Sequence, residues 1–225
     1  MAHLNIRSLT HKSAHVYGLI NTENLDLFCI SETWTTSMTD QCLTDAAPAG
    51  YSFVSKPRAK KKGGGVAIIH RSGMQIQKLF INKAPHLETV SVKITYLGKS
   101  FIVVCLYKAP YFQDDTTLRK IGSFLKKINS LKLPVIITGD LNVHLDDPRD
   151  FQTARVNQYL VENFMRQHVS CATHHGGHCL DIIITSRSVE MNNLLVQHQP
   201  NNLTDHSVLI WSVTVKRCRS NRVCR

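Results

Sequence analysis

Asp140 and Asn142 lie two positions apart, directly after the apolar run 135–139, and they are the side chains best placed for chemistry. Alternate residues of a strand face the same side, so this carboxylate and amide could point at one bound group. The pair is ambiguous by itself. Gly and Asp also favour turns, and a strand-end aspartate is more often a turn former or helix cap than a catalyst.

Polar side chains follow other apolar runs of the chain in the same way. These further strand-end positions are Asn5, Glu32, Tyr107, Asp181 and the adjacent Asp205 and His206. On one rim, carboxylate, amide, phenol and imidazole groups could hold a hard divalent cation and a phosphodiester. Mg²⁺ is typically held by one or two carboxylates together with phosphate oxygens of the substrate. Glu32 is the carboxylate that we expect to be a ligand.

Structural explanations exist for most of these positions when each is taken alone. Asn5 could be a turn residue, Tyr107 a rim aromatic and Glu32 the cap of a helix. Asp205 and His206 are harder to explain structurally, because they form a polar pair that opens the apolar run 207–213. The ordered set therefore favours a catalytic interpretation more than any one residue does.

Length and composition restrict the class of protein. The 225 residues suit one domain, which we expect over residues 1–215, followed by a basic tail at 216–225. An apolar content of 43% and a mean hydropathy of -0.13 are typical of a soluble protein with a sizeable core. No apolar run of transmembrane length and no secretory signal is visible, so we expect an intracellular protein. Seven irregularly spaced cysteines fit reduced thiols better than a disulfide framework.

The formal net charge of +11 predicts a polyanionic partner. Basic residues concentrate in the segment 56–62, which contains Lys60, Lys61 and Lys62, and in the tail 216–225. A basic run can also be a solvated surface or a localisation signal. Because no amphipathic helix accompanies either segment, we expect nucleic acid rather than a membrane as the partner.

Periodicity predicts more strands than helices. Strands are expected at 2–6, 25–31, 65–70, 88–96, 100–107, 134–139, 180–185 and 206–215, and helices at 12–22, 116–131 and 153–166. This ratio favours two packed sheets flanked by a few helices over a regular alternation of strand and helix. The strand ends would then lie on a rigid scaffold that positions the polar side chains.

Taken in order, the motifs resemble those of the endonuclease/exonuclease/phosphatase superfamily, in particular the abasic-endonuclease-like nuclease domains of vertebrate, fish-like LINE-type non-LTR retrotransposons. The matching stretches cover nearly the whole chain and lie at 4–9, 30–34, 63–68, 87–88, 106–110, 139–142, 167–169, 172–174, 177–181 and 204–207. The resemblance implies an α/β (α+β) fold, namely a DNase I-like, four-layer αββα sandwich of two mostly antiparallel sheets.

The resemblance also implies roles for the strand-end residues. Asp140 would orient or deprotonate the attacking water, with Asn142 holding it, and Tyr107 and His206 would donate hydrogen bonds to the phosphoryl oxygens. Asp181 would fix the imidazole of His206. The implied cation neighbours are Glu32, Asn5 and Asp205, and the implied DNA contacts are Arg7, Thr173, Thr204, Lys108, Lys60, Lys61 and Lys62. The loops that we expect to contact DNA and set target preference are the basic segment 56–62 and the stretch near 192–202.

Two departures and one competing motif qualify this pattern. Thr204 stands where many relatives have serine and keeps the hydroxyl, whereas Lys108 keeps a charge but loses the bidentate fork of arginine. The cluster of histidines and cysteines at 171–179 could bind zinc, but its spacings match no common zinc finger and it overlaps the family motif.

The resemblance implies a Mg²⁺-dependent endonuclease, with Mn²⁺ able to substitute, that leaves a 3′-hydroxyl to prime reverse transcription. Its implied partners are double-stranded DNA and a reverse transcriptase domain of the same polyprotein. We expect a monomer that is made in the cytoplasm and acts in the nucleus. The alternatives are a cellular abasic-site repair endonuclease and a domesticated DNA-binding module without catalysis.

Overall fold

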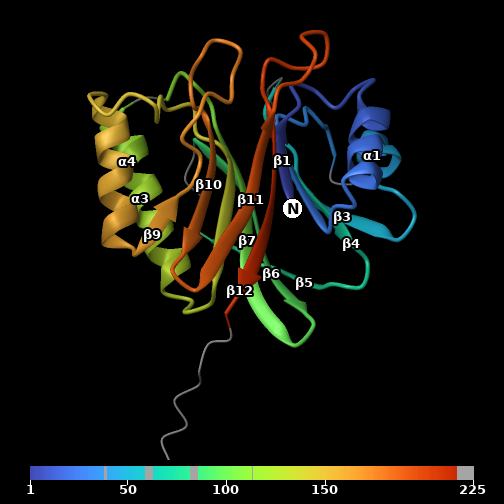
Figure 1. The fold of residues 1–225 in the computed structure, drawn as a ribbon, viewed down its shortest axis with the longest axis horizontal. Helices are drawn as coiled ribbons and strands as arrows, with labels where there is room; N and C mark the ends of the chain where they lie inside the picture. Colours follow the sequence, from blue (N-terminus) through green and yellow to red (C-terminus); the bar gives the residue numbers. More distant parts are fainter. Residues whose placement is uncertain (38–39, 59–62, 82–85, 113, 217–225) are drawn as a thin grey trace, which may run out of the picture.

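Two six-stranded sheets face each other in this computed structural model, which describes residues 1–37, 40–58, 63–81, 86–112 and 114–216 (Figure 1). In sheet order, the first contains β11 (Val189–Gln197), β12 (Val208–Val215), β1 (Ala2–Asn5), β2 (Leu27–Ser31), β4 (Val66–Arg71) and β3 (Tyr51–Lys56). The second contains β5 (Gln75–Lys78), β6 (Leu87–Tyr96), β7 (Lys99–Lys108), β8 (Val135–Asp140), β10 (Asp181–Ser186) and β9 (Met165–Gln167). Within the sheets, the β1–β2 and β7–β8 pairs are parallel and the other pairs are antiparallel.

Helices cover the outer face of each sheet (Figure 1). The helices α1 (Ser13–Thr22) and α2 (Gln41–Ala46) lie on the first sheet, and α3 (Asp115–Asn129) and α4 (Phe151–Glu162) lie on the second. Aspartate side chains cap three of the four: Asp40, Asp114 and Asp150 each accept a hydrogen bond from a backbone N–H of the first turn. Each cap ends the preceding loop and fixes where that helix begins.

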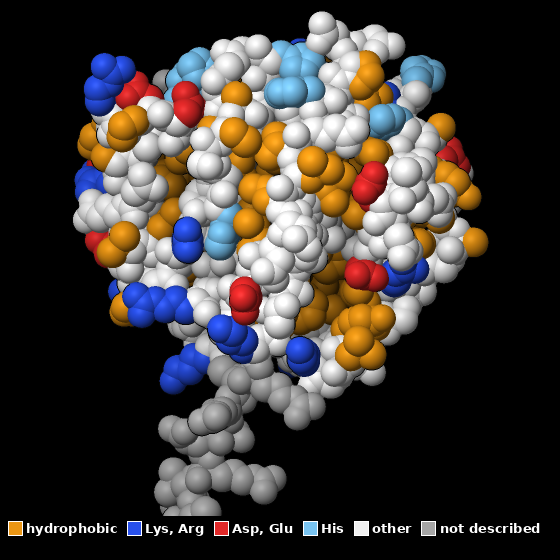
Figure 2. Space-filling view, viewed as in Figure 1, with side chains coloured by type: hydrophobic (Ala, Val, Ile, Leu, Met, Phe, Trp, Pro, Cys, Tyr) orange, Lys and Arg blue, Asp and Glu red, His pale blue; other side chains and the backbone are white. Residues whose placement is uncertain are grey.

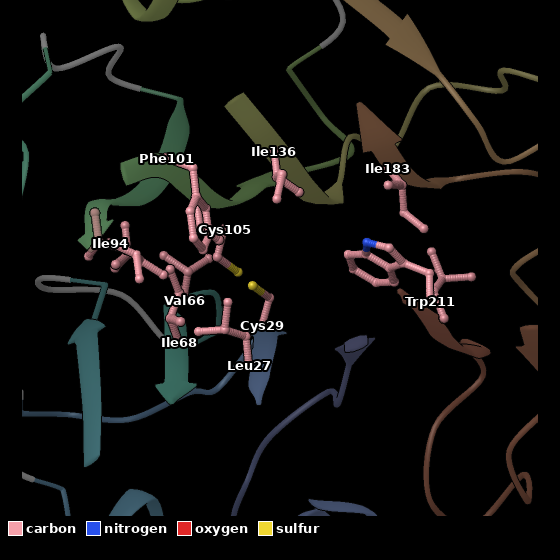
Figure 3. Packing of buried hydrophobic residues seen from close by; sticks show 14 of the residues in the cluster. Leu27, Cys29, Val66, Ile68, Ile94, Phe101, Cys105, Ile136, Ile183 and Trp211 are labelled. Carbon is pink, nitrogen blue, oxygen red and sulfur yellow. The ribbon is translucent and has the colours of Figure 1, made fainter. Parts of the chain in front are cut away.

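Apolar side chains fill the space between the sheets and the space beneath each helix pair. In the layer between the sheets, the thiols of Cys29 and Cys105 face each other from β2 and β7 (Figure 3). Burial keeps the pKa of Cys105 well above its ordinary value, and all five cysteines in the described ranges are free. The prediction of reduced thiols is confirmed for these residues, and Cys218 and Cys224 lie outside them.

The predicted architecture of two sheets flanked by helices is confirmed. Three details of the sequence prediction were wrong. The strands β3, β5, β9 and β11 and the helix α2 were not predicted. The helix expected at 153–166 ends at Glu162, and Met165 already belongs to β9. The stretch 192–202, expected to be a DNA-contacting loop, is strand as far as Gln197.

No helix in the described part of the chain is long and apolar enough to cross a membrane. The basic tail predicted at 216–225 lies outside the described residues from 217 onward, and so do Lys60, Lys61 and Lys62.

Candidate active site

Strand direction brings the polar strand ends together at one end of the two sheets. Because β1 and β2 are parallel, Asn5 at the end of β1 lies beside Ser31, and Glu32 follows directly. In the second sheet β7 runs parallel to β8, which places Tyr107 beside Asp140. The antiparallel strand β10 begins at Asp181, opposite Asp140.

Asn5 joins the two sheets through its side-chain amide. Its Nδ2 donates to Glu32 Oε1 at 3.0 Å and to Asp140 Oδ2 at 2.9 Å, and the residue is fully buried. Glu32 has a φ of 53°, which turns the chain out of β2, and its Oε2 accepts a hydrogen bond from Trp34 Nε1 at 3.0 Å. The exposed rim and the buried carboxylate of Asp140 are therefore parts of one network.

Asp140 has a buried carboxylate that is held from both sides. Its Oδ1 accepts from the Asn142 backbone N–H at 2.8 Å, and its Oδ2 accepts from Asn142 Nδ2 at 3.0 Å. Burial raises the pKa of Asp140 to about 7, and the negative charge of Asp181 adds to this effect. A carboxylate with a pKa near neutrality is suited to accept a proton from water at neutral pH.

His206 and Asp181 form a buried pair. His206 Nδ1 lies 2.9 Å from Asp181 Oδ2, and the opposite ring atom, Nε2, lies 4.0 Å from Asp140 Oδ2. Burial alone would lower the pKa of His206, but the charges of Asp181, Asp140 and Asp205 outweigh it and raise the pKa to about 9. The imidazole is therefore protonated at neutral pH, and its Nε2–H can donate to a bound anion.

Tyr107 supplies a second donor at this end of the sheets, and this donor is neutral. Burial raises the pKa of its phenol far above the ordinary value, and the charges of Glu32 and Asp140 act in the same direction. The guanidinium of Arg58 lies over the Tyr107 ring, 5.5 Å from the ring centroid. The hydroxyl group thus keeps its proton and can donate a hydrogen bond.

Histidines gather along this edge of the molecule (Figure 2), and two groups that include His206 have metal-ligating spacing. They are His174–Asp205–His206 and Asp140–Asp181–His206. His174 Nδ1 accepts a hydrogen bond from the Gly176 backbone N–H at 2.9 Å, so the proton of the neutral ring lies on Nε2, which is 3.1 Å from Asp205 Oδ2. With Nδ1 of His206 bonded to Asp181 as well, both groups are better described as hydrogen-bonded pairs than as ligand sets.

Glu32 and Asn5 fit a hard divalent cation better. Glu32 Oε1 accepts from Asn5 and Oε2 from Trp34, and Asn5 Oδ1 accepts from the Arg7 backbone N–H at 3.1 Å. Carboxylate and amide oxygens can each accept more than one partner. Carboxylate and amide oxygens at a partly exposed edge are the donors that Mg²⁺ prefers. Asp205, the third predicted cation neighbour, is instead held by Arg7 at 2.5 Å and by His174.

Two hydroxyl groups predicted to contact DNA are buried and used by the fold. Thr173 Oγ1 accepts from the backbone N–H groups of Leu180 at 3.1 Å and Asp181 at 3.0 Å. Thr204 Oγ1 donates to the Asn5 carbonyl oxygen at 2.8 Å. These hydroxyls position Asp181 and Asn5, and their contact with DNA stays a prediction.

Lys108 is also buried, and its contact with DNA stays a prediction. Its ammonium donates to the carbonyl oxygens of Phe112 at 3.1 Å and Asn142 at 3.3 Å, and burial lowers its pKa to about 8. Arg7 is the one predicted DNA-contacting residue in the described ranges that is exposed, with 53% of its side-chain surface accessible. The sequence does not single out Trp34 or His3 as members of this network. The signal that could have identified His3 is its position two residues before Asn5, because alternate residues of a strand face the same side.

The chain belongs to the Endonuclease/Exonuclease/phosphatase family, whose pattern it matches over residues 2–206. The family comprises hydrolases that act as nucleases and phosphatases, which agrees with a site built from carboxylates, an imidazole and a phenol. No curated protein matches the sequence.

Solved structures of similar fold span several activities. The endonuclease domain of TRAS1, a telomere-specific non-LTR retrotransposon, has a TM-score of 0.74 at 13% identity, covering 96% of this chain and 98% of that one. An AP endonuclease from Archaeoglobus fulgidus has a TM-score of 0.72 at 16% identity, covering 95% and 98%. The mannosyl-6-phosphatase Bt3783 of Bacteroides thetaiotaomicron has a TM-score of 0.71 at 14% identity, covering 95% and 98%. At sequence identities of 13%, 14% and 16%, the likeness to these structures establishes a shared fold and no more.

Proposed function

We propose that this chain is the Mg²⁺-dependent endonuclease domain of a LINE-type non-LTR retrotransposon and that it nicks double-stranded DNA. The observation that carries the proposal is the continuous network at one end of the sheets, in which Asn5 links Glu32 to Asp140 beside the Asp181–His206 pair. The net charge of +11 supports a polyanionic substrate, and the likeness to the TRAS1 endonuclease supports the retrotransposon origin.

In this proposal each side chain has a distinct task. Asp140 takes the proton of the attacking water, and Asn142 holds that carboxylate in place. His206 donates from Nε2 and Tyr107 from its hydroxyl to the phosphoryl oxygens, where negative charge grows as the bond breaks. Glu32 and Asn5 would hold the divalent cation, which would neutralise phosphate charge when bound.

The biological setting is part of the proposal. Hydrolysis would leave a 3′-hydroxyl that primes reverse transcription by a polymerase domain of the same polyprotein. We propose that the domain acts as a monomer on nuclear DNA, with Mn²⁺ able to replace Mg²⁺.

The deciding experiment is a nicking assay on supercoiled plasmid with Mg²⁺, run against EDTA. We expect open-circular product only with the metal ion, and we expect DNA polymerase to extend the nicks directly from their 3′ ends. Ends that must first be treated with a phosphatase would contradict the proposed chemistry. Binding at low salt without any cutting would favour a DNA-binding module.

A second function is favoured by the likeness to the archaeal AP endonuclease, and it needs its own comparison. The rate of nicking on an intact duplex is measured against the rate on the same duplex carrying one abasic site. We expect similar rates. A strong preference for the abasic site would overturn the retrotransposon assignment in favour of cellular repair.

A further inference from the structure

His3 is a fully buried histidine on β1, two residues before Asn5. Leu4, between them, packs in the layer beneath α1, so His3 and Asn5 face the opposite sheet. The ring of His3 therefore lies behind the active-site network and has no access to substrate.

Two buried polar atoms face each other at this position. His3 Nδ1 lies 3.6 Å from Asp181 Oδ1, and neither atom has another hydrogen-bond partner among the described residues. The other ring nitrogen, Nε2, lies 3.1 Å from Ser31 Oγ. An unsatisfied buried donor or acceptor costs about 1–3 kcal/mol, and more when the group is charged. A small approach of the ring to the carboxylate would satisfy both atoms.

The position of the Asp181 carboxylate determines which ring nitrogen of His3 carries a proton. A proton on Nε2 would leave the Nδ1 lone pair facing the ionised oxygen of Asp181, which is repulsive. A proton on Nδ1 faces that oxygen as a donor, and the Ser31 hydroxyl can then donate to Nε2.

We propose that His3 is a positioning residue that donates from Nδ1 to Asp181 Oδ1. This bond fixes the rotation of the carboxylate whose other oxygen, Oδ2, orients His206. The chain Ser31–His3–Asp181–His206 thus extends the active-site network into the core between the sheets. The effect on cleavage rests on the proposed nuclease function, whereas the hydrogen bond itself does not.

The tautomer can be measured without any activity. In the wild-type protein with ¹⁵N-labelled histidine, NMR is expected to show a His3 ring protonated on Nδ1. A ring protonated on Nε2 alone overturns the proposal, even in a preparation that cuts no DNA. Because this test needs no variant and no substrate, its failure is distinct from a failure of the nuclease assignment.

Two substitutions test the positioning role. Asn places its amide nitrogen close to the position of a histidine Nδ1, whereas Leu removes the donor and keeps similar bulk. We expect His3→Leu to lower the single-turnover nicking rate about tenfold with little change in half-saturating DNA, and His3→Asn to restore most of it. His70→Asn, a buried histidine of β4 in the same sheet, is the matched control and should keep the wild-type rate.

The variants must separate a hydrogen bond from simple packing. If His3→Asn is as slow as His3→Leu, or if His3→Leu is as fast as wild type, His3 does not position Asp181. If His3→Leu does not fold, the NMR tautomer of the wild-type protein decides.

Discussion

The two sheets contribute carboxylates to one network in different surroundings. The first sheet contributes Glu32, which is half-buried and follows β2 in a turn. The second sheet contributes Asp140 and Asp181, which are fully buried within strands. The same functional group is thus available to a cation on one side and enclosed in a hydrogen-bonded interior on the other.

Burial makes the carboxylates of the second sheet suited to proton transfer. Asp140 has a raised pKa, whereas the positive charge of His206 lowers the pKa of Asp181 against the opposing effect of burial. Two aspartates opposite each other in neighbouring strands are therefore pushed apart in acidity, one to accept a proton and one to stay ionised. Substitutions on each side should differ in kind, and the following experiments test that difference.

Asp140→Asn should have the largest effect. It removes the proton acceptor and keeps the size of the side chain, so we expect the nicking rate to fall by about 10²–10⁴-fold at saturating Mg²⁺. Affinity for DNA, measured by fluorescence anisotropy, should stay near wild type. Activity that returns at high Mg²⁺ would place Asp140 on the cation side and break the division between the sheets.

The pH dependence of stability should separate two buried histidines with opposite shifts. His206 has a folded pKa of about 9, above the usual value of 6.5, so its contribution is complete below pH 6.5 and is lost as pH rises through 9. His3 has a folded pKa of about 4, so its contribution is present above pH 6.5 and is lost as pH falls toward 4. Each contribution is on the order of 3 kcal/mol.

Chemical denaturation of the metal-free protein between pH 4 and about pH 9.5 measures the free energy of unfolding of wild type and of each variant. Because Asp140, with a pKa of about 7, titrates in the opposite sense to His3 in the acid range, each histidine is assessed from the difference between wild type and its variant. The stability advantage of wild type over His3→Asn should shrink as pH falls from 6.5 toward 4, and its advantage over His206→Gln should shrink as pH rises through 9. A difference between wild type and His206→Gln that stays constant over that rise would contradict the raised pKa of His206.

Glu32→Gln tests the exposed side with a smaller expected effect. The amide keeps the shape and loses the charge, so we expect the Mg²⁺ concentration for half-maximal nicking to rise about 10–100-fold. At saturating Mg²⁺ the rate should recover most of its wild-type value. A metal titration of nicking measures this, and a rate that stays low at every Mg²⁺ concentration would contradict the assignment.

Much of the scaffold could be predicted because its central strands are apolar for their whole length. Val135–Asp140 is buried throughout, so both the strand and its terminal aspartate were visible in the sequence. The strand β11 was missed because only Val189 in it is buried, it contains Asn192 and Asn193, and its register is irregular after Asn192. Short edge strands such as β9 offer too few residues for a period to be recognised.

The environment of each polar side chain was harder to predict than its position. Thr173 and Lys108 are polar residues next to catalytic motifs, which is equally expected of a DNA contact and of a structural hydrogen bond. The deciding factor is which backbone groups the loops leave unpaired. The N–H groups of Leu180 and Asp181 need an acceptor, and Thr173 supplies it. The sequence does not reveal such a requirement, because it depends on how the connection between β9 and β10 folds back on itself.

Arg7→Ala should have the smallest effect and tests whether the exposed edge touches the DNA backbone. Its ion pair with Asp205 is largely solvated, so we expect a stability change below about 1 kcal/mol. If Arg7 neutralises a phosphate, the slope of log affinity against log salt concentration should fall by about one. Lys108→Met is the matched control, because a lysine buried against carbonyl oxygens should leave that slope unchanged while lowering stability. An unchanged slope in Arg7→Ala would mean that Arg7 stays paired with Asp205 in the complex and that other residues hold the backbone.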